Sequence, residues 1–245
     1  MNFDNDFIMQ NNARILQGFQ FQPRYKPMQK EERSDEPGHP EKIRLSADER
    51  RFLLSIWTYQ YKLTLTETYS VVGFSASKGT RIAKKLEREF MIKIFNIVKG
   101  KGVSKYPVLL ADSYKILDIE ERKFEGKGCG YEHLIWQHIF AGHFKEHNSK
   151  IELNRGNKCI DVAFEYENKL IAIEVAMTSA HEKENIEKDI NLARAGIVII
   201  GCRDEKVLSE VNSIIQELDE QLKNKARPFI LSKILSLSLE GLVKQ

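Results

Sequence analysis

The sequence has few of the features that mark secreted, disulfide-bonded or membrane-spanning proteins. Its three cysteines, Cys129, Cys159 and Cys202, have neither the number nor the spacing of a disulfide framework or a zinc site. No run of about eighteen apolar residues is present, and no apolar stretch follows basic residues near the N-terminus. We therefore expect a cytoplasmic protein with reduced thiols and no membrane partner.

The sequence also lacks a strong net charge and a glycine-rich phosphate-binding loop. The formal net charge is only +3, so an argument for nucleic-acid binding depends on where the charges lie. Without the phosphate-binding loop, the sequence does not contain a nucleotide-driven motor. Hydrophobic residues make up 42% of the 245 residues, which is enough for one large core or two small ones.

Residues 1–44 combine Asn, Gln, Pro and charged side chains with few apolar ones. Such a segment cannot bury enough apolar surface to offset the entropy lost on ordering. We therefore predict a flexible N-terminal segment.

Residues 45–122 are predicted to hold three helices and a β-hairpin. Ser46 and Glu49 form a capping-box pattern at the start of the first helix. A second helix is expected from Leu65, and a third from Ser75 or Ser77. Two β-like runs then flank a Gly-Lys-Gly turn at 100–102. This order resembles a winged helix-turn-helix domain, an α+β fold.

Basic side chains concentrate on the third helix and at the hairpin tip. They are Lys78, Arg81, Lys84, Lys85, Arg88, Lys99 and Lys101. In a winged helix these parts meet the major groove and the flanking phosphates, so the resemblance implies double-stranded DNA as the partner. A solvated helix face or a protein-docking module remains the alternative interpretation.

Two carboxylates, Asp161 and Glu174, stand in neighbouring apolar segments that read as paired strands. A two-residue loop at Asn168 and Lys169 would place Asp161 opposite Ala176 and make the two acids diagonal neighbours on one face. A three-residue loop would put them on opposite faces. Buried carboxylates are costly without a cation or hydrogen bonds, so we expect the pair to share a divalent cation.

The second half of the chain, residues 123–245, is predicted to run helix, three strands, helix, strand, helix. With Glu132, Asp161 and Glu174 in that order, it resembles the PD-(D/E)xK, or restriction-endonuclease-like, nuclease superfamily. The resemblance covers roughly residues 126–220 and implies an α/β fold with a mixed central sheet flanked by helices. It also implies that Glu132, Asp161, Glu174 and the backbone of Val175 bind Mg²⁺ or Mn²⁺.

The sequence departs from that family's pattern at Ala176, where a lysine is usual. Lys188, on the following predicted helix, is our candidate for the missing catalytic amine. The alternative is a surface lysine that pairs with Glu184 one turn earlier. Arg155 and Lys158, at a strand turn, are candidates for contacts with the DNA backbone. Four histidines, His133, His138, His143 and His147, are interpreted as helix-surface residues.

Together these features favour a metal-dependent DNA endonuclease acting in mobile-element, repair or defence DNA processing, on double-stranded or branched DNA. The apolar C-terminal tail is a candidate homodimer surface, and a weaker resemblance to conjugation-type ATPase systems implies an ATPase partner. One alternative is a winged-helix transcriptional regulator. The other is a non-catalytic DNA-binding protein with an inactive nuclease fold.

Overall fold

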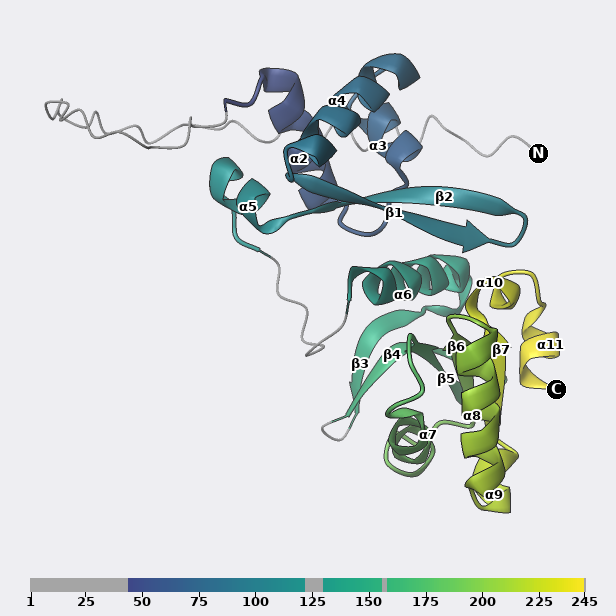
Figure 1. Ribbon diagram of the computed structural model, residues 1–245. Coiled ribbons are helices and arrows are strands. Elements are labelled where there is room, and N and C mark those ends of the chain that lie inside the picture. The colour runs from purple at the N-terminus through teal and green to yellow at the C-terminus, as the bar shows by residue number, and fades with distance from the viewer. Residues whose placement is uncertain (1–43, 122–129, 156–157, 245) are drawn as a thin grey trace, which may run out of the picture. The chain divides into compact units, whose positions relative to one another are not determined.

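The computed structural model describes residues 44–121, 130–155 and 158–244 (Figure 1). Residues 1–43 of the predicted flexible segment, the predicted domain break at 122–123 and Cys129 lie outside the described residues. The side chains of Arg155 and Lys158 are outside them as well. None of the helices in the described ranges has the length and apolar character needed to cross a membrane.

Three helices, each begun by a hydroxyl side chain, open the described chain. They are α2 (Ala47–Thr58), α3 (Leu65–Val71) and α4 (Ala76–Arg88). Ser46 and Thr64 each form a capping box with a glutamate three residues later, and Ser75 caps α4. Of the two serines considered for the third helix, Ser75 is therefore the cap.

A two-stranded antiparallel hairpin follows, made of β1 (Ile92–Lys99) and β2 (Gly102–Leu109). Gly100 begins its two-residue turn with φ +56°, a conformation that glycine adopts without steric cost. A short helix, α5 (Ala111–Leu117), comes next. The three helices and the hairpin occur in the order expected from the sequence.

The helices and the hairpin share one buried core, whose least exposed side chains include Phe52, Leu53, Leu86, Met91 and Leu109. At Gly79, α4 approaches α3 so closely that a Cβ atom there would lie 2.4 Å from the Tyr69 ring. Only glycine permits this distance without movement of the ring.

The rest of the described chain is built on one five-stranded mixed sheet with the order β3-β4-β5-β6-β7. The strands are β3 (Lys150–Arg155), β4 (Lys158–Tyr166), β5 (Lys169–Ala176), β6 (Ile197–Cys202) and β7 (Ala226–Ile230). Strand β4 runs antiparallel to both β3 and β5, whereas β6 runs parallel to β5 and β7 runs parallel to β6. The fold of this part is therefore mixed α/β, as expected.

Helices cover both faces of this sheet (Figure 1). Ile171, Ile173 and Val175 of β5 share one buried cluster with helix α6 (Tyr131–His143). Ala172 and Ala176 point the other way, into a cluster with α7 (Glu182–Asn191) and α8 (Glu205–Glu217). The alternation expected for β5 is thus confirmed, and it places Glu174 on the α7 side.

The hairpin that carries the two acids has a loop one residue earlier than expected. Tyr166 pairs with Lys169, so the two loop residues are Glu167 and Asn168, both with positive φ. The expected Asn168–Lys169 loop was therefore wrong. Because the loop still has two residues, the parity of the strands is unchanged. The regular pairing of β4 with β5 ends at Val162 and Ile173, directly before Asp161 and Glu174.

The C-terminal region adds a strand that was not predicted from the sequence. After α9 (Glu220–Lys223), β7 pairs in parallel with β6, and α10 (Leu231–Ile234) and α11 (Leu239–Val243) follow. Pro228 lies in this strand, which it can do because β7 is at the edge of the sheet.

Candidate active site

Asp161 is held by hydrogen bonds from two elements. One carboxylate oxygen, Oδ1, accepts a 3.0 Å hydrogen bond from the Gln137 side chain of α6 and lies 3.1 Å from Nε2 of His133. The other, Oδ2, accepts the backbone N–H of Val175 at 2.8 Å. The carboxylate therefore has a fixed orientation between α6 and β5.

The path of strand β4 changes at Asp161. Ile160 and Ala163 belong to the buried cluster on the α7 side, whereas Val162 belongs to the cluster on the α6 side. Regular alternation would put Ile160 and Val162 on the same face, so the strand turns over at this point. Glu152, in the neighbouring strand at the same level of the register, has φ +51°. This distortion lets groups from both faces of the sheet approach Asp161.

Three further acids are buried near Asp161. Glu174 is 4% exposed, Glu182 is 5% exposed and Asp189 is fully buried. Among the described residues, one oxygen each of Glu174 and Glu182 and both oxygens of Asp189 have no hydrogen-bond partner. Unpaired buried carboxylates are unfavourable, so the site calls for protons or a cation.

The pKa values of these three acids are raised, because few cations or hydrogen-bond donors offset their burial. Burial raises the pKa of Glu174 well above its usual value, and the charges of Asp161 and Asp189 raise it further. Burial and the Asp161 charge raise the pKa of Glu182 to about 7. The pKa of Asp189 is also raised, mainly by burial. A carboxyl hydrogen bond between Glu174 and Asp189 needs a proton on one of them.

Lys188 points into the sheet side of α7, not along the helix surface. Its Nζ donates to the backbone carbonyl of Cys159 at 3.1 Å and to Asn185 at 3.4 Å, and it lies 3.7 Å from Asp189. The side chain is 16% exposed, and its charge lowers the pKa of Glu174. A surface pair with Glu184, the alternative considered from the sequence, is not the arrangement observed.

Other site residues chosen from the sequence have different surroundings. Glu132 lies half-buried in the first turn of α6, but the α6 side chains that bond Asp161 belong to His133 and Gln137. The expectation that His133 lies on a helix surface was wrong, because its side chain is only 12% exposed. Its spacing of four residues from Gln137 on one helix was the available signal.

Glu182 and Asp189 were not chosen from the sequence. The available signal was helical spacing, because Glu182 and Asp189 fall on the same face of α7 as the apolar Ile186 and Ile190. Both acids are buried on that face.

The negative charge of these acids suits a divalent cation, but their side chains are not arranged as a complete set of metal ligands. Within the described part of the chain, no three His, Cys, Asp or Glu side chains converge with metal-site geometry. Asp161 and Glu174 supply the oxygen donors that Mg²⁺ prefers, and an unpartnered oxygen of Glu174 offers a free ligand position. Since Mg²⁺ keeps several waters, two carboxylates suffice to hold it.

The basic residues of α4 differ in their availability. Lys78 pairs with Asp48 at 2.7 Å and Lys85 with Glu49 at 2.6 Å, so acids of α2 offset two of the predicted DNA contacts. Arg81, Lys84 and Arg88, at helical spacings of three and four, are exposed along one side of α4.

At the hairpin tip, Lys101 is exposed in the turn, and Lys99 lies 5.0 Å from the centre of the Tyr106 ring. Lys99 has the strand parity of Ile97, which shares a buried cluster with Tyr106, whereas Ile92 and Leu109 pack with the helices. Lys99 therefore lies on the hairpin face turned away from α4.

Comparison with known proteins adds no family assignment: neither the protein-family models nor the curated proteins include a match to this chain.

Proposed function

We propose that the protein is a divalent-metal-dependent DNA endonuclease of the PD-(D/E)xK, restriction-endonuclease-like type, with a winged helix-turn-helix domain that binds double-stranded DNA. The observation that carries this proposal is the convergence of Asp161, Glu174 and Lys188. Val175, next to Glu174, donates its backbone N–H to Asp161, and Lys188 donates to the carbonyl of Cys159, two residues before Asp161. The charges of Asp161 and Lys188 both act on the pKa of Glu174. A structural core would not normally gather several acids around a single lysine.

Asp161 and Glu174 would hold Mg²⁺ or Mn²⁺, with Glu132 and the Val175 carbonyl as the further ligands implied by the family resemblance. When bound, the ion lowers the pKa of a coordinated water and offsets charge on the phosphate. His133 and Gln137 fix the Asp161 carboxylate, as outer hydrogen-bonding partners commonly do at metal sites.

Lys188 would take the place of the lysine that Ala176 replaces. Its ammonium group lies on the same side of the sheet as Glu174 and already donates to the Cys159 carbonyl beside Asp161. From there it would orient the attacking water and stabilise the negative charge that develops on the phosphate oxygens. Its cation also keeps Glu174 more readily ionised.

DNA would be held by the exposed basic side of α4 and the tip of the hairpin. Arg81, Lys84 and Arg88 have the exposure needed for phosphate contacts, and Lys99 and Lys101 would supply further cations at the hairpin tip. Lys78 and Lys85 would contribute less, because acids of α2 pair with them. Such a pairing of modules suits mobile-element, repair or defence DNA processing.

A second candidate function is DNA binding without cleavage by an inactive nuclease fold. Alanine at position 176 and the lack of a convergent metal cage among the described residues favour this candidate. In that case bound protons, and not a cation, would offset the charge of the buried acids, whose pKa values are raised.

A plasmid-cleavage assay decides between the two functions. We expect nicking of supercoiled plasmid that requires Mg²⁺ or Mn²⁺ and falls at least about a hundredfold in Asp161→Asn and Glu174→Gln. Glu165→Gln is the matched control, because Glu165 is exposed on the same hairpin. Wild-type protein that binds DNA yet cuts no substrate with either metal would establish the non-catalytic function instead.

The DNA-binding part has an independent test in the salt dependence of affinity. Replacing Arg81, Lys84 and Arg88 by Gln should lower the slope of log affinity against log salt by about 2 to 3, if each side chain neutralises one phosphate. Lys206→Gln, an exposed lysine on α8, is the control. An unchanged slope in the triple variant would exclude α4 as the DNA-binding element.

A further inference from the structure

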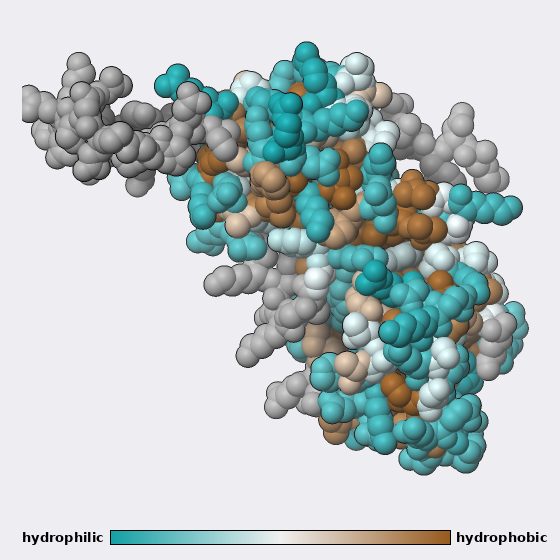
Figure 2. Space-filling model, in the orientation of Figure 1, coloured by the Kyte–Doolittle hydropathy of each residue, from teal (hydrophilic) through white to brown (hydrophobic). Residues whose placement is uncertain are grey.

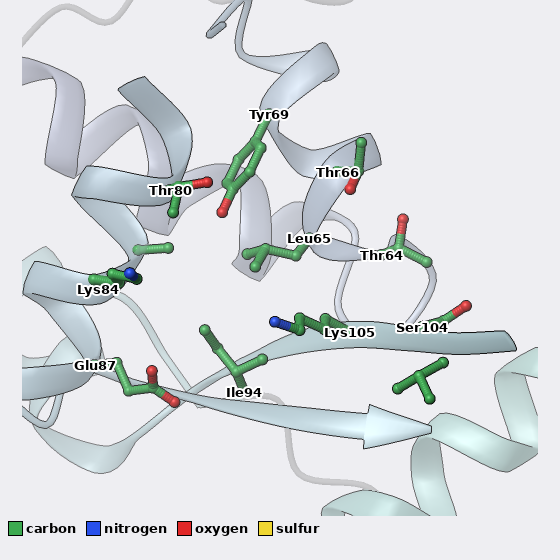
Figure 3. Close-up of a pocket in the computed structure, with 12 residues that line it drawn as sticks. Thr64, Leu65, Thr66, Tyr69, Thr80, Lys84, Glu87, Ile94, Ser104 and Lys105 are labelled. Carbon is green, nitrogen blue, oxygen red and sulfur yellow. The ribbon is translucent and has the colours of Figure 1, made fainter. Parts of the chain in front are cut away.

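A pocket of about 440 Å³ lies between α3, α4 and the β1–β2 hairpin. Figure 3 shows it from the side, with α4 on one flank and the hairpin beneath. In the space-filling view, apolar atoms gather along the hairpin below α4, whereas much of the remaining visible face is hydrophilic (Figure 2). The polar side chains that line the pocket include Tyr69, Thr80, Lys84, Glu87, Ser104 and Lys105.

Two ammonium groups reach this pocket from different elements. Lys84 extends from α4 and Lys105 from β2, and Figure 3 shows both side chains directed toward the space between the helix and the hairpin. Within the described residues, neither lysine lies within ion-pair distance of a carboxylate. The pocket therefore offers two cations to one small anion.

The Tyr69 hydroxyl adds a buried donor to the pocket. Tyr69 is only 6% exposed, and its hydroxyl completes no hydrogen bond of normal geometry with the described residues. The Thr80 hydroxyl lies close enough to influence its pKa, but burial dominates and raises that pKa, so the hydroxyl stays protonated at neutral pH. An unsatisfied buried donor of this kind favours a ligand with acceptor oxygens.

The charge of the lining selects among phosphate ligands. Lys84 and Lys105 contribute +2 and Glu87 contributes −1, which leaves +1. A phosphodiester carries a single negative charge, whereas a phosphate monoester carries about −1.5 to −2 at neutral pH. A diester therefore matches the pocket, and a monoester or free phosphate would leave uncompensated negative charge beside Glu87.

We propose that this pocket binds one phosphodiester group of the DNA backbone, with Lys84 and Lys105 as its cations and the Tyr69 hydroxyl as a hydrogen-bond donor. The inference rests on the proposed DNA binding by α4 and the hairpin, and it adds a fixed anchoring point to that surface. Phosphate contacts of this type set the register of a protein on the duplex without reading its sequence.

The test uses Tyr69→Phe, Lys105→Gln and the double variant. Tyr69→Phe removes only the hydroxyl and keeps the ring that packs against Gly79. Each single variant should weaken duplex binding about ten- to a hundredfold by fluorescence anisotropy, because a hydrogen bond to a charged group is lost. The double variant should lose much less than the product of the two, since both groups contact the same phosphate. Lys115→Gln, exposed on α5, is the control and should bind as wild type.

A second arm identifies the ligand directly. Titration of labelled protein with dimethyl phosphate should shift the NMR signals of Tyr69 and Lys105 more strongly than the same concentration of inorganic phosphate. Tighter binding of inorganic phosphate, or no response to either, would overturn the assignment. So would single variants that bind duplex normally, or a double variant that loses the full product of their effects.

The outcomes also separate this inference from the proposed function. If the Arg81, Lys84 and Arg88 triple variant loses DNA affinity while the Tyr69 and Lys105 variants do not, DNA binding by α4 stands and the pocket is not its phosphate site. If the wild-type protein binds no DNA, the proposed function fails, and the dimethyl phosphate titration still decides what the pocket binds.

Discussion

Replacing Glu182 by Gln should stabilise the metal-free protein at neutral pH but not at low pH. Glu182 is buried at the start of α7, and burial together with the Asp161 charge raises its pKa from 4.5 to about 7. In the unfolded chain the same carboxyl group ionises near its ordinary value. A difference of this size corresponds to about 3 kcal/mol of folding free energy.

The direction of the stability change with pH depends on whether the folded or the unfolded state binds the proton of Glu182 more tightly. Below about pH 4.5, both the folded and unfolded states keep the proton on Glu182, so its ionisation has no effect on stability. As pH rises from about 4.5 to 7, the unfolded chain releases the proton while the folded protein retains it, and stability falls. Gln cannot ionise, so this loss is absent in the variant.

Urea denaturation at several pH values, with EDTA present, measures the effect. The stability of Glu182→Gln relative to wild type should increase between pH 4.5 and 7.5 by an amount approaching about 3 kcal/mol. Glu184→Gln, on the same helix but with its side chain 82% exposed, should show almost no such trend. A stability difference for Glu182→Gln that stays constant with pH would refute the reasoning.

The remaining predictions concern helix packing and the catalytic amine. Gly79→Ala should destabilise the protein by about 1 to 3 kcal/mol in urea denaturation, because the added methyl group would overlap the Tyr69 ring. Gly142→Ala on α6, where nothing lies within 4 Å of the new methyl group, should be neutral or slightly stabilising; equal losses would contradict this. Lys188→Met should lower the cleavage rate constant about a hundredfold or more while DNA affinity stays unchanged, and a normal rate would exclude Lys188.

The acid pair shows which part of the site follows from local sequence. Alternation within β5 places Glu174 on the α7 face, and this was predictable from the sequence. The loop position was missed, because Glu167 adopts a left-handed conformation that its side chain does not favour. The surroundings of Asp161 were not predictable, because β4 turns over there and its carboxylate bonds Gln137 of α6.

Contacts between distant segments were not predictable. Asp48 pairs with Lys78, 30 residues later, and Glu49 pairs with Lys85, 36 residues later, and these pairs reduce the basic surface. The buried face of Asp189 follows from helical spacing, but its interaction with Glu174 does not. Such features depend on how helices pack, which a single sequence does not specify.

The most direct test of the proposed site is to locate a metal ion in crystals of the protein soaked with Mn²⁺. Anomalous scattering should show a peak about 2 Å from carboxylate oxygens of both Asp161 and Glu174, and the peak should be absent in Asp161→Asn. Crystals that hold Mn²⁺ only elsewhere, or none at concentrations that support cleavage, would contradict the proposal that this acid pair binds the catalytic cation.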